Sequence, residues 1–377
     1  MSVKAQAYTF EPVDVDWVAS SLRELLDSGS FLTLGRYGEQ FEDAFAERHG
    51  GGFGVSTNSG TSALEAILRS LDVAGGEVVL PTNTFAATAF AVVRAGARPV
   101  FADIGDDMTL DPVDAAARFT PSTRAVITVH LGGLVSPRTY DVIEMCDRFA
   151  VPLVEDAAHA HGSALDGRSA GTFGVAAAFS FFSTKVMTTG EGGMVVTRDE
   201  AIRDSVRLLR DQAKVAGSNV HEAIGANWRL TEVQAMLGLA QLRRLDEFIA
   251  RRQDIARRYR EGLDGIPGLT VLPVPPGAHH NFYKVIVLLD SMSPAVLASR
   301  MRSEHQVALG GNVYDLPLHE QPVFAEYATG PLPVAEDLCR RHVCPPIYPA
   351  LSDDDVDLVV AGIRDCVETR TPSGGEA

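Results

Sequence analysis

The sequence has few cysteines, no long apolar run and no apolar segment near its start. Its four cysteines form neither a CxxC pair nor a pattern with zinc-site spacing, so we interpret them as reduced thiols; they are Cys146, Cys339, Cys344 and Cys366. No stretch approaches the ~18 apolar residues of a membrane-spanning helix. The opening residues, MSVKAQAYTFEPVD, lack the apolar core of a secretory signal. The sequence predicts a cytoplasmic protein outside the membrane.

Basic residues are fewer than acidic ones, and several ligand-binding motifs are missing. The formal net charge of −16 argues against nucleic acid or an anionic membrane as the main partner. The sequence has no GxGxxG after a strand and no GxxxxGK[ST], which leaves dinucleotide and P-loop sites without support. Histidines and carboxylates do not occur at a recognisable metal-ligand spacing, so no metal is expected.

Short apolar runs alternate with helical patterns between residues 50 and 200. In 61–71, Leu64, Ile67, Leu68 and Leu71 recur at helical spacing after the run GFGVST. The later runs EVVLP, RPVFADI, AVITVHL and VPLVEDAA are separated by further helical stretches. This order predicts an α/β fold with a mostly parallel mixed sheet covered by helices on both faces. Ligands of such sheets bind at the carboxyl ends of the strands.

The pattern of apolar and polar residues changes after residue 230. Residues 231–263 read as one long amphipathic helix or a kinked pair, with arginines on the polar face. The proline- and glycine-rich stretch GIPGLTVLPVPPGAHH follows and reads as a boundary. We predict an N-terminal segment and large domain over 1–250 and a smaller α+β domain over 251–377.

A phosphate site is predicted where STNSGTSALEAIL passes from strand to helix. Ser59, Gly60 and Thr61 lie at this helix start, where unpaired N–H groups and the positive end of the helix dipole attract anions. The alternative is a plain helix cap by Ser59 or Thr61.

A carboxylate and two histidines follow the run VPLVED. Asp156 ends this apolar run, and a buried carboxylate needs a cationic partner. It is alternatively a helix cap or part of a structural ion pair. His159 and His161 follow it and are equally compatible with core or surface positions.

The stretch FSFFSTKVMTTGEGG brings a lysine beside an apolar run. Lys185 is costly there unless it is paired, neutral or chemically modified; otherwise it lies in a surface loop. Ser180 precedes it, and the glycines after it allow tight backbone passage. With Phe85 as a flat ring after EVVLP, the three loops supply what pyridoxal 5′-phosphate (PLP) needs: a lysine, an acid for the ring nitrogen and a phosphate cradle.

The motifs NSGTSAL, EDAAHAHG, FSFFSTKVMTTGEGG and NWRLTEVQA resemble those of the DegT/DnrJ/EryC1/StrS family of PLP-dependent sugar aminotransferases, which have the aspartate-aminotransferase fold. The resemblance runs over nearly the whole chain. It implies that Lys185 forms the Schiff base and that Asp156 pairs with the pyridinium nitrogen. It implies further cofactor contacts, which are Gly60, Thr61 and Ser180 at the phosphate, Phe85 stacked on the ring, and His159 in place of a common glutamine at the phenolic oxygen.

The resemblance also implies an obligatory homodimer with composite sites. Asn227 matches an asparagine that reaches the phosphate in the neighbouring subunit. The alternative is that Asn227 caps the helix beginning near RLTEVQA.

The substrates follow from the resemblance as well. L-glutamate is the implied amino donor, and a nucleotide-linked ketosugar is the implied acceptor. A free cyclitol ketone, an aromatising reaction like that of aminohydroxybenzoate synthases, and a PLP-binding regulator without turnover are the alternatives. Acceptor contacts are predicted for Arg36, Tyr37, Arg229, Tyr314 and His319. For each of these five a structural hydrogen bond or a surface position is the alternative.

Overall fold

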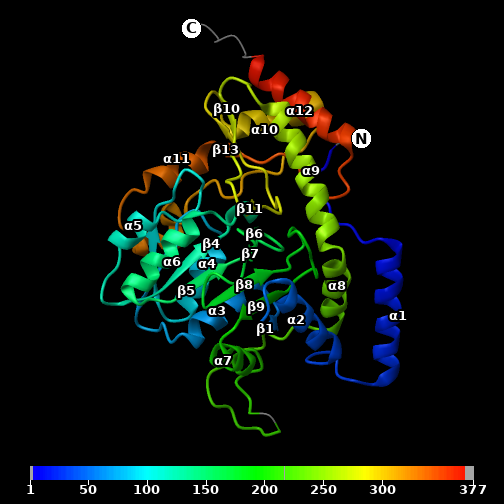
Figure 1. Ribbon diagram of the computed structural model, residues 1–377, viewed down its shortest axis with the longest axis vertical. Coiled ribbons are helices and arrows are strands. Elements are labelled where there is room, and N and C mark those ends of the chain that lie inside the picture. The colour runs from blue at the N-terminus through cyan, green and yellow to red at the C-terminus, as the bar shows by residue number, and fades with distance from the viewer. Residues whose placement is uncertain (1–2, 216, 370–377) are drawn as a thin grey trace.

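The large sheet dominates the fold and confirms the predicted mostly parallel arrangement (Figure 1). The computed structural model describes residues 3–215 and 217–369. Within these ranges, seven strands pair in the order β1-β9-β8-β5-β4-β2-β3. All run in one direction except β9, which is antiparallel to both of its neighbours. The strands are β1 (Phe53–Thr57), β2 (Glu77–Pro81), β3 (Arg98–Ala102), β4 (Thr123–Val129), β5 (Leu153–Asp156), β8 (Ala176–Ser180) and β9 (Gly193–Thr197).

Helices cover both faces of this sheet. In β8, Ala176 and Ala178 face one hydrophobic cluster while Ala177 and Phe179 face another, as the two-residue period of a strand requires. Helices α3, α4 and α7 pack on the first face, and α2, α5, α6 and α8 on the second. The helices of this part are α1 (Pro12–Ser28), α2 (Arg36–Arg48), α3 (Gly60–Ser70), α4 (Ala86–Arg94), α5 (Pro112–Ala117), α6 (Arg138–Phe149), α7 (Glu200–Arg210) and the short η1 (Leu131–Gly133).

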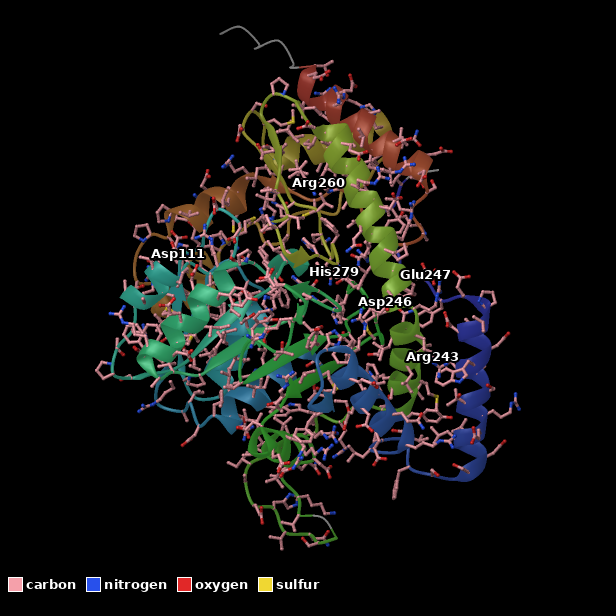
Figure 2. All side chains as sticks on the ribbon, in the orientation of Figure 1. Asp111, Arg243, Asp246, Glu247, Arg260 and His279 are labelled. Carbon is pink, nitrogen blue, oxygen red and sulfur yellow. The ribbon has the colours of Figure 1, made fainter. Side chains whose placement is uncertain are left out.

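The long helical segment after residue 230 is a kinked pair. Helix α8 (Glu232–Arg243) begins with a capping box in which Thr231 and Gln234 bond reciprocally. Arg244 separates it from α9 (Leu245–Leu263). Figure 2 labels Arg243, Asp246, Glu247 and Arg260 along this pair, and all four are exposed. The predicted polar face is therefore present.

A smaller α+β unit follows. Its sheet has the order β10-β12-β13 and is antiparallel. A further small sheet, β11-β6-β7, lies between this unit and the large one. The remaining elements are β6 (Ala164–Leu165), β7 (Arg168–Ser169), β10 (Leu269–Val271), β11 (Ala278–His279), β12 (Val287–Leu289), α10 (Pro294–His305), η2 (Leu318–Glu320), η3 (Pro322–Tyr327), α11 (Pro333–Arg341), β13 (His342–Val343) and α12 (Asp353–Glu368).

Helix α9 belongs to both units. Leu245 and Ile249 pack in the core beneath the large sheet, whereas Ile255, Tyr259 and Leu263 pack in the core of the small unit. The predicted division after residue 250 falls at this change of core, inside an unbroken helix. Val3, assigned by that division to the large domain, packs in the small unit's core. Residues 1–2 and 370–377 of the predicted domains lie outside the described residues.

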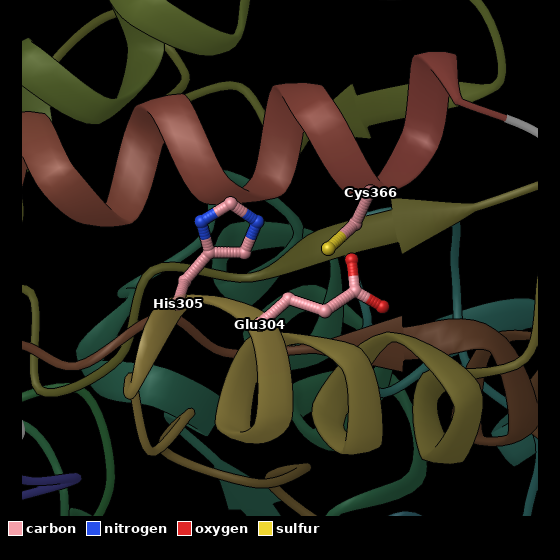
Figure 3. A group of neighbouring side chains, drawn as sticks. All are labelled: Glu304, His305 and Cys366. Atoms are coloured by element: carbon pink, nitrogen blue, oxygen red, sulfur yellow. The ribbon is translucent and has the colours of Figure 1, made fainter.

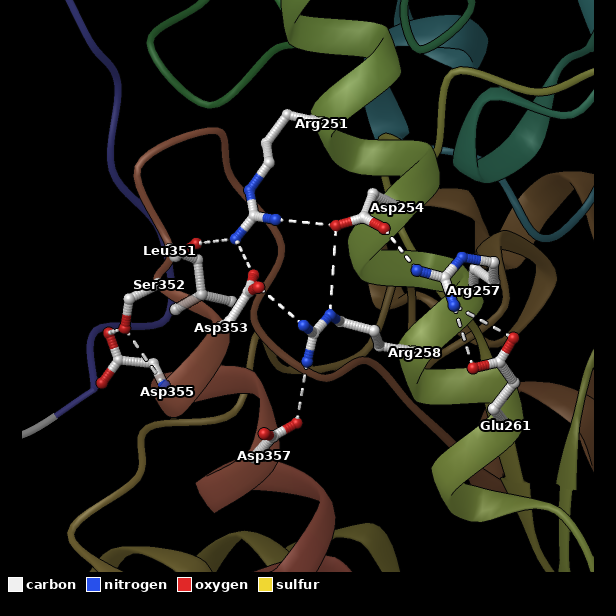
Figure 4. A network of polar contacts seen from close by, with 10 residues as sticks. All are labelled: Arg251, Asp254, Arg257, Arg258, Glu261, Leu351, Ser352, Asp353, Asp355 and Asp357. Atoms are coloured by element: carbon white, nitrogen blue, oxygen red, sulfur yellow. Dashed lines mark hydrogen bonds and ion pairs between the residues drawn. The ribbon is translucent and has the colours of Figure 1, made fainter.

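A surface network of ion pairs joins α9 to α12 (Figure 4). Arg258 lies 2.6 Å from Asp353 and 3.1 Å from Asp357, and Arg251 lies 2.8 Å from both Asp353 and Asp254. Exposed pairs of this kind each contribute about 0–1 kcal/mol. The network therefore supplements the hydrophobic packing of these two helices.

Within residues 3–215 and 217–369, none of the helices combines the length and the apolar character needed to cross a membrane.

Candidate active site

A cavity of about 280 Å³ opens at the carboxyl ends of the parallel strands. Residues that follow β1, β2, β5 and β8 meet there, which is where a sheet of this type binds ligands. The residues that line it are Ser59, Gly60, Thr61, Leu64, Thr84, Phe85, Ala87, Thr88, Val129, Asp156, Ala158, His159, Ser180, Phe182, Lys185, Glu191 and Tyr314. The predicted loops therefore converge on one cavity.

The N-terminus of α3 forms one end of the cavity. Ser59 caps the helix, with its Oγ accepting from the backbone N–H of Ser62 at 3.2 Å. The next two N–H groups, of Gly60 and Thr61, have no partner within the helix. A Cβ atom at Gly60 would lie 2.8 Å from the Cβ of Ser180, so only glycine lets the helix start this close to β8. The arrangement offers backbone donors and the Ser180 hydroxyl to an anion.

Asp156 supplies a buried carboxylate at the end of β5. Thr88 donates from Oγ1 to Oδ2 at 2.8 Å, and the backbone N–H of Ala158 donates to Oδ1 at 3.1 Å. Burial raises the pKa of Asp156, and these two hydrogen bonds and the charge of Lys185 oppose the rise. A cation placed in the cavity would stabilise the ionised form further.

Lys185 lies in the turn between β8 and β9, where its N–H bonds to the carbonyl of Phe182 at 2.9 Å. Its ammonium lies 5.1 Å from the centre of the Tyr283 ring. Burial lowers the pKa of Lys185 to about 8, and the nearby charge of Asp156 opposes this fall. At neutral to slightly alkaline pH, part of the population therefore carries a neutral, nucleophilic amine.

Aromatic rings form the wall beside Lys185. His159 stacks on Tyr283 at 4.3 Å between ring centres, and Tyr314 stacks between His159 and Phe85 at 6.2 and 6.0 Å. The Nδ1 of His159 is buried and has no partner within the described chain. Burial holds the pKa of His159 well below its usual value, so the imidazole is neutral. His161, in contrast, is a core residue packed against Phe179.

Four of the predicted residues lie outside the cavity of this chain because they are engaged elsewhere. Arg36 pairs with Glu24 at 2.7 Å. Arg229 pairs with Asp211. Tyr37 is buried against Trp17. His319 is buried between Thr82, at 2.8 Å, and Glu336, at 3.1 Å.

Asn227 is exposed, and its carbonyl accepts from Asn58 at 3.3 Å. It does not cap α8, because Thr231 does. It also does not line the cavity of its own chain.

The chain matches the DegT/DnrJ/EryC1/StrS aminotransferase family over residues 16–364. It belongs to that family. The transaminase named for dTDP-3-amino-3,4,6-trideoxy-alpha-D-glucose from Micromonospora megalomicea subsp. nigra is 38% identical, over 93% of this chain and 94% of that protein. The UDP-N-acetyl-3-dehydro-alpha-D-glucosamine 3-aminotransferase of Acidithiobacillus ferrooxidans is 34% identical, over 93% of both.

Solved structures agree with this assignment. The aminotransferase TlmJ from Streptoalloteichus hindustanus superposes with a TM-score of 0.90 at 33% identity, covering 98% of this chain and 99% of that one. The DegT/DnrJ/EryC1/StrS protein is thus a PLP-dependent sugar aminotransferase.

The residues of the cavity fit this cofactor. The open start of α3 and the Ser180 hydroxyl suit a phosphate, the Lys185 amine suits an aldehyde, and the Asp156 carboxylate suits a protonated ring nitrogen. The buried and unpartnered Nδ1 of His159 leaves a polar atom for the ligand to satisfy.

Two cavity residues escaped the sequence analysis. Thr88 lies one helical turn after Phe85, at a position that reads as an ordinary helix residue. Lys284 lines a second cavity and lies in the apolar run FYKVIVLL. A lysine within an apolar run is the signal that singled out Lys185, and it identifies Lys284 in the same way.

Two groups of potential metal ligands occur among the described residues, and both are engaged in other contacts. Figure 3 shows Glu304 and His305 at the end of α10 beside Cys366 of α12. Glu304 pairs with Arg300 at 2.8 Å. In the second group His319 and Glu336 bond to each other, while Glu320 pairs with Arg340.

Proposed function

We propose that this aminotransferase moves an amino group from L-glutamate to the carbonyl of a nucleotide-linked ketosugar. The observation that carries the proposal is the placement of Lys185 and Asp156 on one cavity beside the open N-terminus of α3. Two relatives are named for dTDP- and UDP-linked sugars, which supports a nucleotide on the acceptor without fixing which one.

Each cavity group then has a role in holding the cofactor. The N–H groups of Gly60 and Thr61, with the hydroxyls of Ser59 and Ser180, bind the phosphate, because the helix dipole and unpaired donors favour an anion there. Asp156, held in place by Thr88, keeps a proton on the ring nitrogen.

Aromatic side chains complete the cofactor site. Phe85 covers a ring face, and His159 donates to the phenolic oxygen. Bound PLP supplies the electron sink that allows a proton to leave the carbon attached to the donor nitrogen.

Lys185 moves that proton. Its pKa of about 8 gives a useful fraction of free amine near neutral pH, which is the requirement for an efficient general base. Apolar residues that line the cavity, including Leu64 and Val129, exclude water and strengthen the interaction between Lys185 and Asp156.

A second copy of the chain completes the site in this proposal. Asn227 ends the segment 217–227 that follows α7, and it forms an isolated β-bridge with Asp211. Val220 and Ile224 in this segment are 60% and 87% exposed, and Phe31 on another loop is 87% exposed. We infer that these exposed apolar side chains contact the second copy. We place Asn227 at the neighbouring subunit's cavity.

The direct test follows the cofactor's absorbance. L-glutamate added to the purified holoenzyme should convert the visible band of PLP to the near-ultraviolet band of the pyridoxamine form. A panel of dTDP-, UDP- and GDP-linked ketosugars and a free cyclitol ketone should then identify which acceptor restores the visible band. The absence of a spectral response to L-glutamate would contradict the assigned donor. Restoration by the cyclitol alone would contradict the acceptor.

The lysine is tested separately. Borohydride reduction of the holoenzyme should leave the pyridoxyl group on Lys185, as read by peptide mass spectrometry. The chain has only four lysines, Lys4, Lys185, Lys214 and Lys284, so the assignment is unambiguous. The label on any of the other three would overturn the role given to Lys185.

A further inference from the structure

A second lysine faces the site from the small unit. Lys284 precedes β12, and its backbone N–H is fixed to the carbonyl of Gly132 at 3.0 Å. It lines a cavity of about 310 Å³. This cavity shares Phe85, His159, Phe182, Lys185 and Tyr314 with the cofactor cavity, so the two are continuous.

The ammonium of Lys284 has no anionic partner in the described part of the chain. Its one hydrogen bond goes to the carbonyl of Gly310 at 3.2 Å, which leaves two of its three donors free. The ionisable groups that act on its pKa are Cys344 and Arg252. Burial raises the pKa of the Cys344 thiol to about 11, so this group is uncharged at neutral pH, and Arg252 is a cation.

A charge that is partly buried and has no counter-ion is unfavourable. Burial lowers the pKa of Lys284 for this reason. Asp156, a carboxylate of the cofactor cavity, is bonded to Thr88 and Ala158 and acts on Lys185 instead. A negatively charged group on the bound substrate would offset the unfavourable free energy of the unpaired Lys284 charge.

Lys284 lies close to the reacting lysine. Its ammonium is 5.4 Å from the centre of the Tyr283 ring, and that of Lys185 is 5.1 Å from the same centre. Both lysines line the same cavity, so an anion held by Lys284 lies in the cavity that contains the reacting amine. In an amino acid, a carboxylate is bonded directly to the reacting carbon. In a nucleotide-linked ketosugar, the diphosphate is separated from the ketone by the sugar ring.

We propose that Lys284 binds a carboxylate of the amino donor and so determines that the donor is an amino acid. This inference rests on the proposed function, since it names the group that recognises the donor in that same site. Lys284 forms an ion pair with the carboxylate through its free donors, beside the Tyr283 ring that both ammonium groups approach.

The experiment compares Lys284→Met, which removes the charge, with Lys284→Arg, which keeps it. Lys4→Met is the matched control, because Lys4 is exposed and does not line either cavity. The probes are α-methyl-L-glutamate and 2-aminoisobutyrate, which lack the hydrogen that must leave and therefore bind without turnover. Their dissociation constants are read from the absorbance of the PLP-loaded proteins.

Lys284→Met should raise the dissociation constant of α-methyl-L-glutamate by about tenfold or more, the usual effect of losing a charged hydrogen bond. Lys284→Arg should recover most of the affinity, and Lys4→Met should match the wild type. An equal effect on 2-aminoisobutyrate assigns Lys284 to the α-carboxylate, whereas an effect on the glutamate probe alone assigns it to the side-chain carboxylate. Unchanged constants for both probes would overturn the proposal.

A second experiment measures binding of the acceptor. The pyridoxamine form of Lys284→Met should bind a productive ketosugar with wild-type affinity. Weaker binding of the ketosugar with unchanged donor binding would also overturn the proposal, because Lys284 would then serve the acceptor's phosphates. A wild-type protein that does not respond to L-glutamate rejects the proposed function itself, which separates the two failures.

Discussion

Two neighbouring carboxylates at the end of β5 have different tasks because they point to opposite faces of the sheet. Glu155 is fully buried and accepts from His130, Gly171, Phe173 and Gly174 at 2.6 to 2.9 Å. These hydrogen bonds occupy the Glu155 carboxylate and stabilise the fold. Asp156 accepts two hydrogen bonds in the described chain and lines the cavity, so it retains capacity for a ligand.

Asp156→Asn should therefore fold and still bind PLP but lose activity by about 10² or more, because an amide cannot stabilise the charge on the ring nitrogen. The loss is measured as kcat/KM with L-glutamate and a productive acceptor. Thr88→Val is the matched variant, since it removes only one hydrogen bond to the carboxylate. It should lower kcat/KM by a smaller factor. Activity of Asp156→Asn within a few-fold of the wild type would exclude this role.

Lys185 destabilises the cofactor-free protein in a pH-dependent way. Its pKa is about 8 in the folded chain and 10.5 in the unfolded one, so the folded state binds fewer protons between these values. The cost is full below about pH 8 and is lost as the pH rises to 10.5. Lys185→Met should thus stabilise the cofactor-free protein by on the order of 2 kcal/mol at neutral pH.

Urea unfolding at neutral pH and near pH 10.5 measures this gain. It should be absent at the higher pH, and Lys4→Met should have no comparable effect because Lys4 is exposed. The same gain at both pH values would mean that it comes from packing and not from charge.

At the scale of elements, helix α3 depends on how closely its first residue approaches β8. Gly60→Ala places a Cβ atom 2.8 Å from that of Ser180, so the helix start must move away from the strand. The N–H groups then shift from the phosphate, and PLP affinity should fall by about tenfold. Absorbance titration of the cofactor-free protein measures the affinity. Ser70→Ala, at the far end of the same helix, is the control. Equal affinities for Gly60→Ala and the wild type would remove this helix from the phosphate site.

The sequence predicted secondary structure best where apolar residues recur at regular spacing. Apolar runs bounded by turn residues predicted β1, β2, β4 and β5, and strand-end placement brought Lys185 and Asp156 to one cavity. The cap of α8 was missed: Thr231 and Gln234 have the spacing of a capping box, and Thr231, not Asn227, caps this helix.

Other positions carried no such signal. His319 lies in the aperiodic stretch DLPLHEQP, and its burial between Thr82 and Glu336 depends on a contact across more than two hundred residues. Arg36 and Tyr37 lie at the start of an amphipathic helix, where the pattern does not decide whether a side chain pairs locally or reaches the site.

At the scale of the whole molecule, the proposed sharing of the site between two subunits predicts complementation between defective variants. Lys185→Ala lacks the reacting amine, and Asn227→Asp puts a carboxylate beside the partner's phosphate site. A mixed dimer has one site with both native residues and one with neither. Unfolding and refolding an equal mixture should restore about a quarter of the sites of a two-fold dimer. Steady-state activity of the mixture, compared with each variant refolded alone, measures this. Mixed dimers no more active than the separate variants would place Asn227 outside the partner's site.

The continuity of α9 limits how this protein can be recombined with its relatives. Its first residues, Leu245 and Ile249, pack under the large sheet, and Ile255, Tyr259 and Leu263 form part of the other core. A chimera joined at residue 250 would divide this helix between two parents. A junction in the loop after Leu263 keeps the helix whole but places its C-terminal half in a foreign core. Successful exchange of the C-terminal unit therefore requires matching those three side chains to the incoming core.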